Sequence, residues 1–315
     1  MKTLVIGAAG FVGGHLIDAL SQEHAAEIFA TKLPAETLSR DDCTVCDLDI
    51  CDADAVLACM QTVQPDRIVH LAAQSSVALS WKNPGLTANV NIMGTLHVLD
   101  AMRQAVPGAR LLLVGSGEEY GAVKPEQCPV SEAAALSPAN MYAATKVCTE
   151  ELARFYARSY ALHIVMTRSF NHFGPGQSET FVLADFCRQA SAIALGIQAP
   201  VIRTGNLSAK RDFTDVRDIV RAYLLLLEQG TPGEVYNVGS GKARAVAELL
   251  EMIRAQAETA FTVETDPARF RPVDVPLIEP DITKLMRDTG WQPRIPTEQT
   301  IADTLAFWRG KLSQE

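Results

Sequence analysis

Residues 111–121 read LLLVGSGEEYG, and residues 142–146 read YAATK. The run Leu111–Val114 is too short and too rich in Leu and Val for a surface helix, so it predicts a buried strand. Ser116 then lies at the carboxyl end of that strand, where open α/β sheets bind their ligands. Tyr142 and Lys146 are four residues apart on a predicted helix and share one face of it. An ammonium beside a phenol favours the ionised phenol, so we expect Tyr142 to act as an acid or base near neutral pH.

A glycine-rich turn follows the first apolar run of the chain. Thr3–Ile6 predicts a strand, and GAAGFVG at residues 7–13 leads from it into a helical pattern. Glycines at this point let the backbone approach a pyrophosphate at the N-terminus of the helix. The turn therefore predicts a dinucleotide site with the contacts Gly7, Gly10, Phe11, Val12 and Gly13.

Length and composition exclude several other classes of protein. The chain has 315 residues, 48% of them hydrophobic and 21% charged, as in an ordinary globular α/β protein. Its formal charge of -9 argues against a nucleic-acid surface. We expect a cytoplasmic protein with no membrane segment, because no stretch approaches the ~20 apolar residues of a spanning helix. The seven cysteines are expected to be reduced, and Cys43 and Cys46 lack the further ligands that a metal site needs.

The glycine turn, Ser116 and the Tyr-x-x-x-Lys pattern together resemble the short-chain dehydrogenase/reductase superfamily, in particular its extended branch, the NAD-dependent epimerase/dehydratase family. The resemblance runs essentially end to end. It implies a Rossmann-type doubly wound parallel sheet with a smaller, discontinuous C-terminal substrate-binding domain. The implied division gives residues 1–170 and 211–240 to the dinucleotide-binding domain, and 171–210 and 241–315 to the substrate domain. The apolar stripes of residues 95–104 and 142–159 imply a homodimer, although plain core packing explains them equally well.

The end of the second predicted strand, Glu27–Thr31, bears on the cofactor. An acidic residue there would bind the ribose 2′-hydroxyl of NAD. Thr31 and Lys32 stand there instead, and a hydroxyl with a cation suits the 2′-phosphate of NADP; NAD stays open because Lys32 could equally be a solvated surface lysine. Further cofactor contacts implied by the resemblance are Asp49, Ile50, Leu71, Ala72, Ala73, Asn91, Tyr142 and Lys146. The alternative for Asn91 is that it does not bind the cofactor and is a buried amide that ties two strands together.

The resemblance also implies a nucleotide-sugar substrate, with GDP as the expected nucleotide. Its motifs are NHFGPGQ at residues 171–177, KRDF at residues 210–213 and RFRPVDV at residues 269–275. A guanidinium suits the bidentate binding of a diphosphate. Asp274 stands where the family often has Glu, which shortens its reach to the nucleoside ribose. The implied substrate contacts are Ser76, Glu118, Asn171, Arg211, Arg271 and Asp274.

In such enzymes Tyr142 would exchange a proton with the oxygen at C4 of the sugar, Ser116 would hydrogen-bond that oxygen, and Lys146 would hold the nicotinamide ribose. Epimerases, 4,6-dehydratases and 4-ketoreductases share this core. Glu118 occupies the position at which dehydratases carry their acid/base; alternatively it is a polar rim residue.

The absence of an Arg- and Ser-rich insertion after the second strand, the chain length and residues 170–177 favour the reductases of the family. We therefore expect reduction of the 4-keto group of a nucleotide-linked 6-deoxyhexose, GDP-4-keto-6-deoxymannose giving GDP-rhamnose. A 4,6-dehydratase is the main alternative. A 4-epimerase and a non-catalytic NADP-binding protein are less favoured.

Overall fold

The computed structural model describes residues 1–23, 26–269 and 275–314. Its main sheet has seven strands in the order β10-β6-β5-β4-β1-β2-β3, and every neighbouring pair is parallel. The strand order reverses beside β1, which is the doubly wound arrangement predicted from the sequence. The strands are β1 (Lys2–Ile6), β2 (Glu27–Lys32), β3 (Thr44–Asp47), β4 (Arg67–His70), β5 (Arg110–Ser116), β6 (His163–Ser169) and β10 (Val235–Val238).

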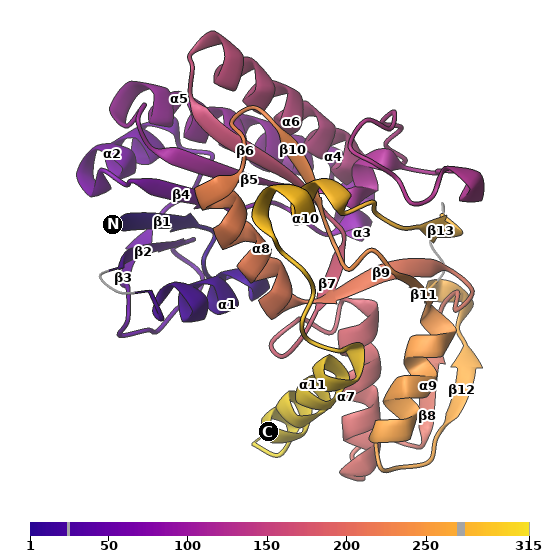
Figure 1. Cartoon of the computed structure of the whole chain (residues 1–315). Coiled ribbons are helices and arrows are strands. Elements are labelled where there is room, and N and C mark those ends of the chain that lie inside the picture. The colour runs from indigo at the N-terminus through magenta and orange to yellow at the C-terminus, as the bar shows by residue number, and fades with distance from the viewer. Residues whose placement is uncertain (24–25, 270–274, 315) are drawn as a thin grey trace.

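Helices cover both faces of this sheet and enclose a separate apolar core on each face (Figure 1). Successive strand residues point to opposite faces, so Leu4 and Ile6 enter one core while Val5 enters the other. The helices on the Leu4 face are α2 (Ala53–Val63), α5 (Gly94–Ala105) and α6 (Met141–Ser159). Those on the Val5 face are α1 (Phe11–Leu20), α8 (Val216–Gln229) and α10 (Thr283–Thr289).

A smaller part of the molecule lies below the carboxyl end of the sheet in Figure 1. Strand β9 pairs with β7, β11 and β13, and β8 pairs with β12. Apolar side chains such as Phe186, Leu250 and Leu305 join its three helices in a core of their own. The strands are β7 (Asn171–Phe173), β8 (Val201–Thr204), β9 (Lys210–Asp215), β11 (Ala243–Ala245), β12 (Thr262–Thr265) and β13 (Leu277–Ile278). The helices are α7 (Val182–Ala194), α9 (Val246–Gln256) and α11 (Thr297–Leu312).

The chain returns to the large sheet after leaving it. Leu285 on α10 and the following Trp291 are fully buried in the core that α1 and α8 form against the sheet. The indole Nε1 of Trp291 donates a hydrogen bond of 3.0 Å to the carbonyl of Asp218 on α8. The domain division at residues 170, 211 and 241 stays a prediction, and we propose to move α10 and Trp291 from its substrate part to its dinucleotide part.

Short helices and turns connect the longer elements of the fold. The segment Asn89–Met93 is a π-helical turn between α4 and α5, and such turns are frequent at functional sites. None of the helices in the described ranges is long and apolar enough to cross a membrane. The short helices are α3 (Val77–Lys82), α4 (Pro84–Ala88) and the 3₁₀ turns Gly117–Tyr120, Pro125–Gln127 and Pro267–Arg269.

Candidate active site

Three predicted catalytic residues lie together where β5 meets α6. Ser116 is the last residue of β5, and its hydroxyl shares a hydrogen bond with the Tyr142 hydroxyl. Tyr142 and Lys146 lie on the first turns of α6, which Asn140 caps by accepting a 2.9 Å bond from the Ala143 amide. The Lys146 ammonium donates 2.7 Å to the carbonyl of Val114 and lies 5.9 Å from the centre of the Tyr142 ring. The strand end and the helix start thus bring together the groups that the sequence pattern singled out.

The ionisation of Tyr142 depends on its surroundings. Burial raises the pKa of its phenol above the ordinary value, while the hydrogen bond with Ser116 opposes that rise. Burial also lowers the pKa of Lys146 to about 8. The Lys146 ammonium is bonded to a backbone carbonyl, and its effect in favour of the phenolate stays a prediction.

Glu118 lies in the 3₁₀ turn after β5, half-buried at the edge of the site. Its carboxylate accepts a 3.2 Å hydrogen bond from the Asn140 side chain, and its backbone N–H donates 3.2 Å to the Ser116 hydroxyl. Glu118 therefore lies next to the catalytic groups. Both predicted roles, as an acid/base acting on the sugar and as a polar residue at the rim of the site, fit this position.

The glycine turn fits the pyrophosphate of a dinucleotide. Gly7 has a φ of +84°, and a Cβ there would lie 2.7 Å from the backbone of Ala72. A Cβ at Gly13 would lie 2.3 Å from the Ala8 carbonyl, so α1 packs against the turn without space for a side chain. Gly10 caps α1, and within the described chain no side chain bonds the first N–H groups of this helix. Free N–H groups at a helix N-terminus bind anions, and the turn leaves them accessible.

Phe11 connects this turn to the smaller part of the molecule. Its ring stacks on His172 of β7 with centroids 6.2 Å apart and an interplanar angle of 8°. His15, one helical turn further along α1, meets the Phe11 ring edge-on and bonds the Pro175 carbonyl at 2.9 Å. Val12, the remaining predicted contact of the turn, is half-buried at the start of α1.

Both residues predicted to bind the 2′-phosphate already have partners in the protein. The Thr31 hydroxyl accepts a 3.2 Å hydrogen bond from the N–H of Gly7 and is buried. The Lys32 ammonium forms a 2.5 Å ion pair with Asp47, the last residue of the neighbouring strand β3. Asp47 therefore brings an acid to this end of the sheet.

The other predicted cofactor contacts line the same edge of the sheet. Asp49 is exposed after β3 and accepts a 2.9 Å bond from the Cys51 amide, and Ile50 is buried against Gly94. The segment of Leu71, Ala72 and Ala73 follows β4 and is tied to β1, because the first two amides donate to the Ile6 carbonyl at 2.9 and 3.0 Å.

Asn91 is a buried amide, as in the alternative given for it from the sequence. It accepts 2.8 Å from the Gln74 amide, donates 3.2 Å to the Gln74 carbonyl and donates 2.9 Å to the Thr145 hydroxyl. Its side chain thus ties the segment after β4 to α6, next to Lys146, rather than joining two strands.

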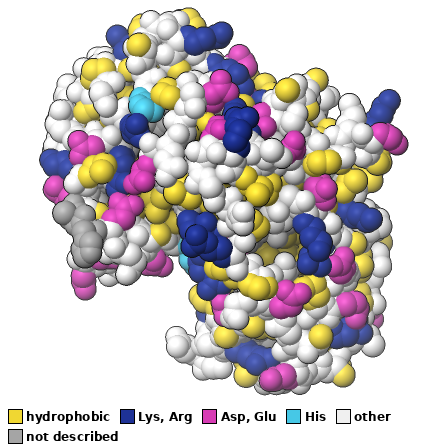
Figure 2. Space-filling view, viewed as in Figure 1, with side chains coloured by type: hydrophobic (Ala, Val, Ile, Leu, Met, Phe, Trp, Pro, Cys, Tyr) yellow, Lys and Arg dark blue, Asp and Glu magenta, His cyan; other side chains and the backbone are white. Residues whose placement is uncertain are grey.

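The predicted substrate contacts occupy different elements. Ser76 caps α3 and accepts 3.2 Å from the Leu79 amide. Asn171 is exposed at the start of β7, and Arg211 is half-buried on β9, which pairs with β7. Arg271 and Asp274 lie outside the described residues. The outline of the molecule narrows between its two parts, and Lys and Arg side chains lie on the surface near this junction (Figure 2).

A buried ionic network beneath Ser116 was not predicted. Arg168 on β6 forms bidentate hydrogen bonds of 2.9 and 2.7 Å with Glu150 on α6. It also donates 3.0 Å to the Tyr120 hydroxyl and lies 3.8 Å from the Glu119 carboxylate. Of these residues, only Glu119 and Tyr120 were quoted from the sequence, and neither was given a role there. The side chains of this network come from segments that are far apart in the sequence. No spacing of residues along the chain therefore indicates that they meet.

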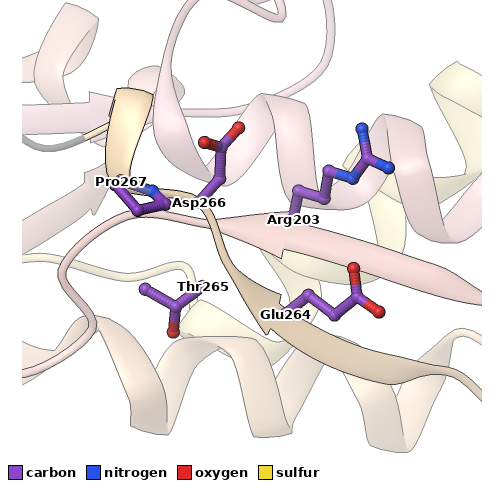
Figure 3. Close-up of a pocket in the computed structure, with 5 residues that line it drawn as sticks. All are labelled: Arg203, Glu264, Thr265, Asp266 and Pro267. Atoms are coloured by element: carbon purple, nitrogen blue, oxygen red, sulfur yellow. The ribbon is translucent and has the colours of Figure 1, made fainter.

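A shallow hollow of about 240 Å³ lies on the β8–β12 strand pair, away from these groups (Figure 3). Arg203 and Glu264 are register partners on the two strands and stand beside it. None of its lining residues belongs to the predicted site. They are Arg203, Glu264, Thr265, Asp266 and Pro267.

The doubly wound sheet, the glycine turn and the Ser, Tyr and Lys side chains define the nicotinamide-dependent short-chain dehydrogenase/reductase class. The sequence profile of the family described as GDP-mannose 4,6 dehydratase matches residues 4–304. The chain belongs to this family.

Named relatives and solved structures agree with that assignment. The chain is 32% identical to GDP-6-deoxy-D-mannose reductase of Pseudomonas aeruginosa, covering 100% of this chain and 99% of that protein. It is 31% identical to GDP-mannose 4,6-dehydratase of Sinorhizobium fredii, covering 83% and 81%. The structure of RMD from Pseudomonas aeruginosa complexed with NADPH superposes with a TM-score of 0.88 at 30% identity, covering 98% of this chain and 99% of that one. The prediction of a nucleotide-sugar enzyme family is confirmed.

Proposed function

We propose that the protein reduces the 4-keto group of a nucleotide-linked 6-deoxyhexose, with GDP-4-keto-6-deoxy-D-mannose as substrate and GDP-D-rhamnose as product. One observation carries the choice of reduction: the similarity to GDP-6-deoxy-D-mannose reductase of Pseudomonas aeruginosa extends over 100% of this chain and 99% of that protein, and Tyr142 and Ser116 lie together at the site. A phenol that keeps its proton is a donor, and a ketone gains a proton on its oxygen when it is reduced. Oxidation of a sugar hydroxyl, the first step of a dehydratase or epimerase, needs a base at the same place.

Relatives support the same choice. Similarity to the Pseudomonas aeruginosa reductase covers the whole chain, whereas similarity to the Sinorhizobium fredii dehydratase covers 83% of it. The reductase structure carries NADPH, which supports NADPH as the cofactor of this chain. A bound nicotinamide would supply the hydride, and the glycine turn would hold its pyrophosphate.

The protein's own groups would act on the C4 oxygen. The Ser116 hydroxyl orients that oxygen and the Tyr142 hydroxyl gives it a proton. After donation, the Ser116 hydrogen bond stabilises the phenolate, since it opposes the effect of burial on the Tyr142 pKa. Lys146, held by the Val114 carbonyl, supplies a positive charge close to the phenol.

The dehydratase is the second candidate because of Glu118. Its carboxylate lies next to Asn140 and Ser116, close enough to the catalytic groups to remove a proton beside the C4 carbon. The proposal of a reductase gives Glu118 only a binding role, so Glu118→Gln should reduce ketone reduction less than tenfold.

We also propose that α5 and α6 form a dimer interface. Phe155 and Tyr160 on and beside α6 are 50% and 46% exposed, and Met93 before α5 is 42% exposed. Exposed apolar side chains on adjacent helices are typical of a protein interface. Sedimentation of the wild type and of Phe155→Glu tests this part, and a wild-type monomer would contradict it.

A paired incubation tests the reaction. One sample holds the protein with GDP-mannose and NADP, and the other holds it with GDP-4-keto-6-deoxymannose and NADPH. We expect NADPH oxidation and a new 6-deoxyhexose NMR signal in the second sample only. Tyr142→Phe should abolish both signals, and Tyr160→Phe, which changes an exposed tyrosine, should keep them. A 4-keto-6-deoxy product in the first sample would replace the reductase by the dehydratase.

A further inference from the structure

Glu119 is a fully buried acid directly beneath the catalytic serine. Its Oε1 accepts a 2.7 Å hydrogen bond from the backbone N–H of Ser116. Its Oε2 has no hydrogen-bond partner among the described residues and lies 3.8 Å from the Nε of Arg168. A buried carboxyl oxygen without a hydrogen bond is costly, so its position under the active site calls for a role.

The strand end is shaped to accept this carboxyl group. A Cβ at Gly115 would lie 2.7 Å from Oε1 of Glu119 and 2.3 Å from the carbonyl of Thr167. Glycine at residue 115 therefore provides the space in which Glu119 can turn back and bond Ser116.

Charged groups face Glu119 from two neighbouring elements and from its own turn. Burial, reinforced by Glu150, raises the pKa of the Glu119 carboxyl, while the Ser116 N–H, Arg168 and Lys146 oppose that rise. The charge of Glu119 in turn raises the pKa values of Lys146 and Tyr142. The titratable and charged groups around it are Lys146, Glu150 and Tyr142 on α6, Arg168 on β6, and Glu118 and Tyr120 in its own turn.

We propose that Glu119 is a positioning residue of the active site: its carboxyl group fixes the backbone of Ser116 and sets an acidic group beneath the reacting hydroxyls, next to Lys146 and Tyr142. The inference rests on the proposed reduction, in which Tyr142 must carry a proton. Glu119 then extends the alkaline end of the working pH range without touching the sugar.

The pH dependence of turnover in Glu119→Gln tests this role. Glutamine can still accept the bond from the Ser116 N–H but carries no charge. We expect the alkaline limb of the kcat profile to move to lower pH by about 1 unit, since neighbouring charges shift pKa values by that order. KM for the sugar should stay within twofold. Glu151→Gln, which alters a 63% exposed acid on α6, should follow the wild-type profile.

A second variant and a second readout separate charge from structure. Glu119→Asp keeps the charge but shortens the reach to Ser116, so it should lower kcat and leave the alkaline limb in place. Infrared difference spectra of the free protein should contain a buried carboxylic-acid band that disappears as the pH rises and is missing in Glu119→Gln.

A Glu119→Gln profile that superimposes on the wild type overturns the proposal, and so does a wild-type infrared spectrum without the band. Should the wild type turn over no keto sugar, the proposed reaction fails. The infrared titration then still decides whether Glu119 ionises beneath Ser116.

Discussion

Two ion pairs at the same edge of the sheet differ in their burial. Arg168 and Glu150 lie under the end of β5 with side chains 3% and 4% exposed. Lys32 and Asp47 lie at the ends of β2 and β3 with side chains 16% and 58% exposed. Both are short, but water screens only the second, so we expect the first to matter for folding and the second for ligand choice. Distance alone would have ranked them as equals.

The largest effect is expected from breaking the buried pair. Glu150→Ala leaves the Arg168 guanidinium without its bidentate partner, and an uncompensated buried charge costs about 3–5 kcal/mol. Urea unfolding should show a lower midpoint. Asp47→Asn, the matched change at the exposed pair, should cost less than about 1 kcal/mol. Equal losses in the two variants would remove the distinction.

The pH dependence of stability tests whether the charge of Lys146 is buried, like that of Arg168. Its pKa is about 8 in the folded protein, against 10.5 ordinarily, so between these values the unfolded chain holds the proton more tightly. Stability must then rise with pH across this window, by about 3 kcal/mol if the whole shift is realised. The wild type should gain stability relative to Lys146→Met between pH 8 and 10.5, as measured by urea unfolding at several pH values. A constant difference between the two proteins would contradict the burial of a charged Lys146.

Gly115 tests how closely packed the buried region is. Gly115→Ala would bring a Cβ to 2.3 Å from the Thr167 carbonyl, and overpacking of this kind costs about 1–3 kcal/mol. Gly14→Ala is the control, since its Cβ would meet no atom within 4 Å inside helix α1. That change should stabilise the protein by about 0.5–1 kcal/mol, because glycine disfavours a helix interior. Thermal unfolding of the two variants should move in opposite directions.

The smallest effects belong to the exposed pair and concern the cofactor. Asp47→Asn frees the Lys32 ammonium, so NADPH should bind about threefold to fivefold more tightly while NADH changes little. Lys32→Ala should weaken NADPH binding by a similar factor. Fluorescence titrations at low and high salt would show both effects shrinking as salt rises. Unchanged NADPH affinity in both variants would leave Lys32 without a part in cofactor choice.

The sequence predicted what depends on local pattern. The apolar run of β1, the glycine turn before α1 and the four-residue spacing of Tyr142 and Lys146 predicted these elements and the meeting of the catalytic groups, and the family resemblance implied the doubly wound sheet. The sequence motifs alone indicated the family to which the chain belongs. These features are encoded over a few neighbouring residues, where periodicity and turn chemistry act.

Features that depend on distant segments escaped prediction. Asp47 is fifteen positions from Lys32 and meets it only because β2 and β3 are in register. The raised pKa of Tyr142 follows from burial, which a helical spacing does not reveal. Arg168 on β6 bonds Glu150 on α6, and only the packing of the helix on the sheet brings the two side chains together. Polar groups of this kind are placed by tertiary structure, so a sequence shows the residues but not their partners.

The return of the chain at α10 has a consequence for synthesis of the protein. Leu285 and Trp291 complete the core beside α1, although α1 leaves the ribosome more than 260 residues earlier. The nascent sheet must therefore wait with part of an apolar face uncovered until almost the whole chain has emerged. Chains released early, before Trp291, would carry that exposed face into the cell, where chaperones and proteases select against it.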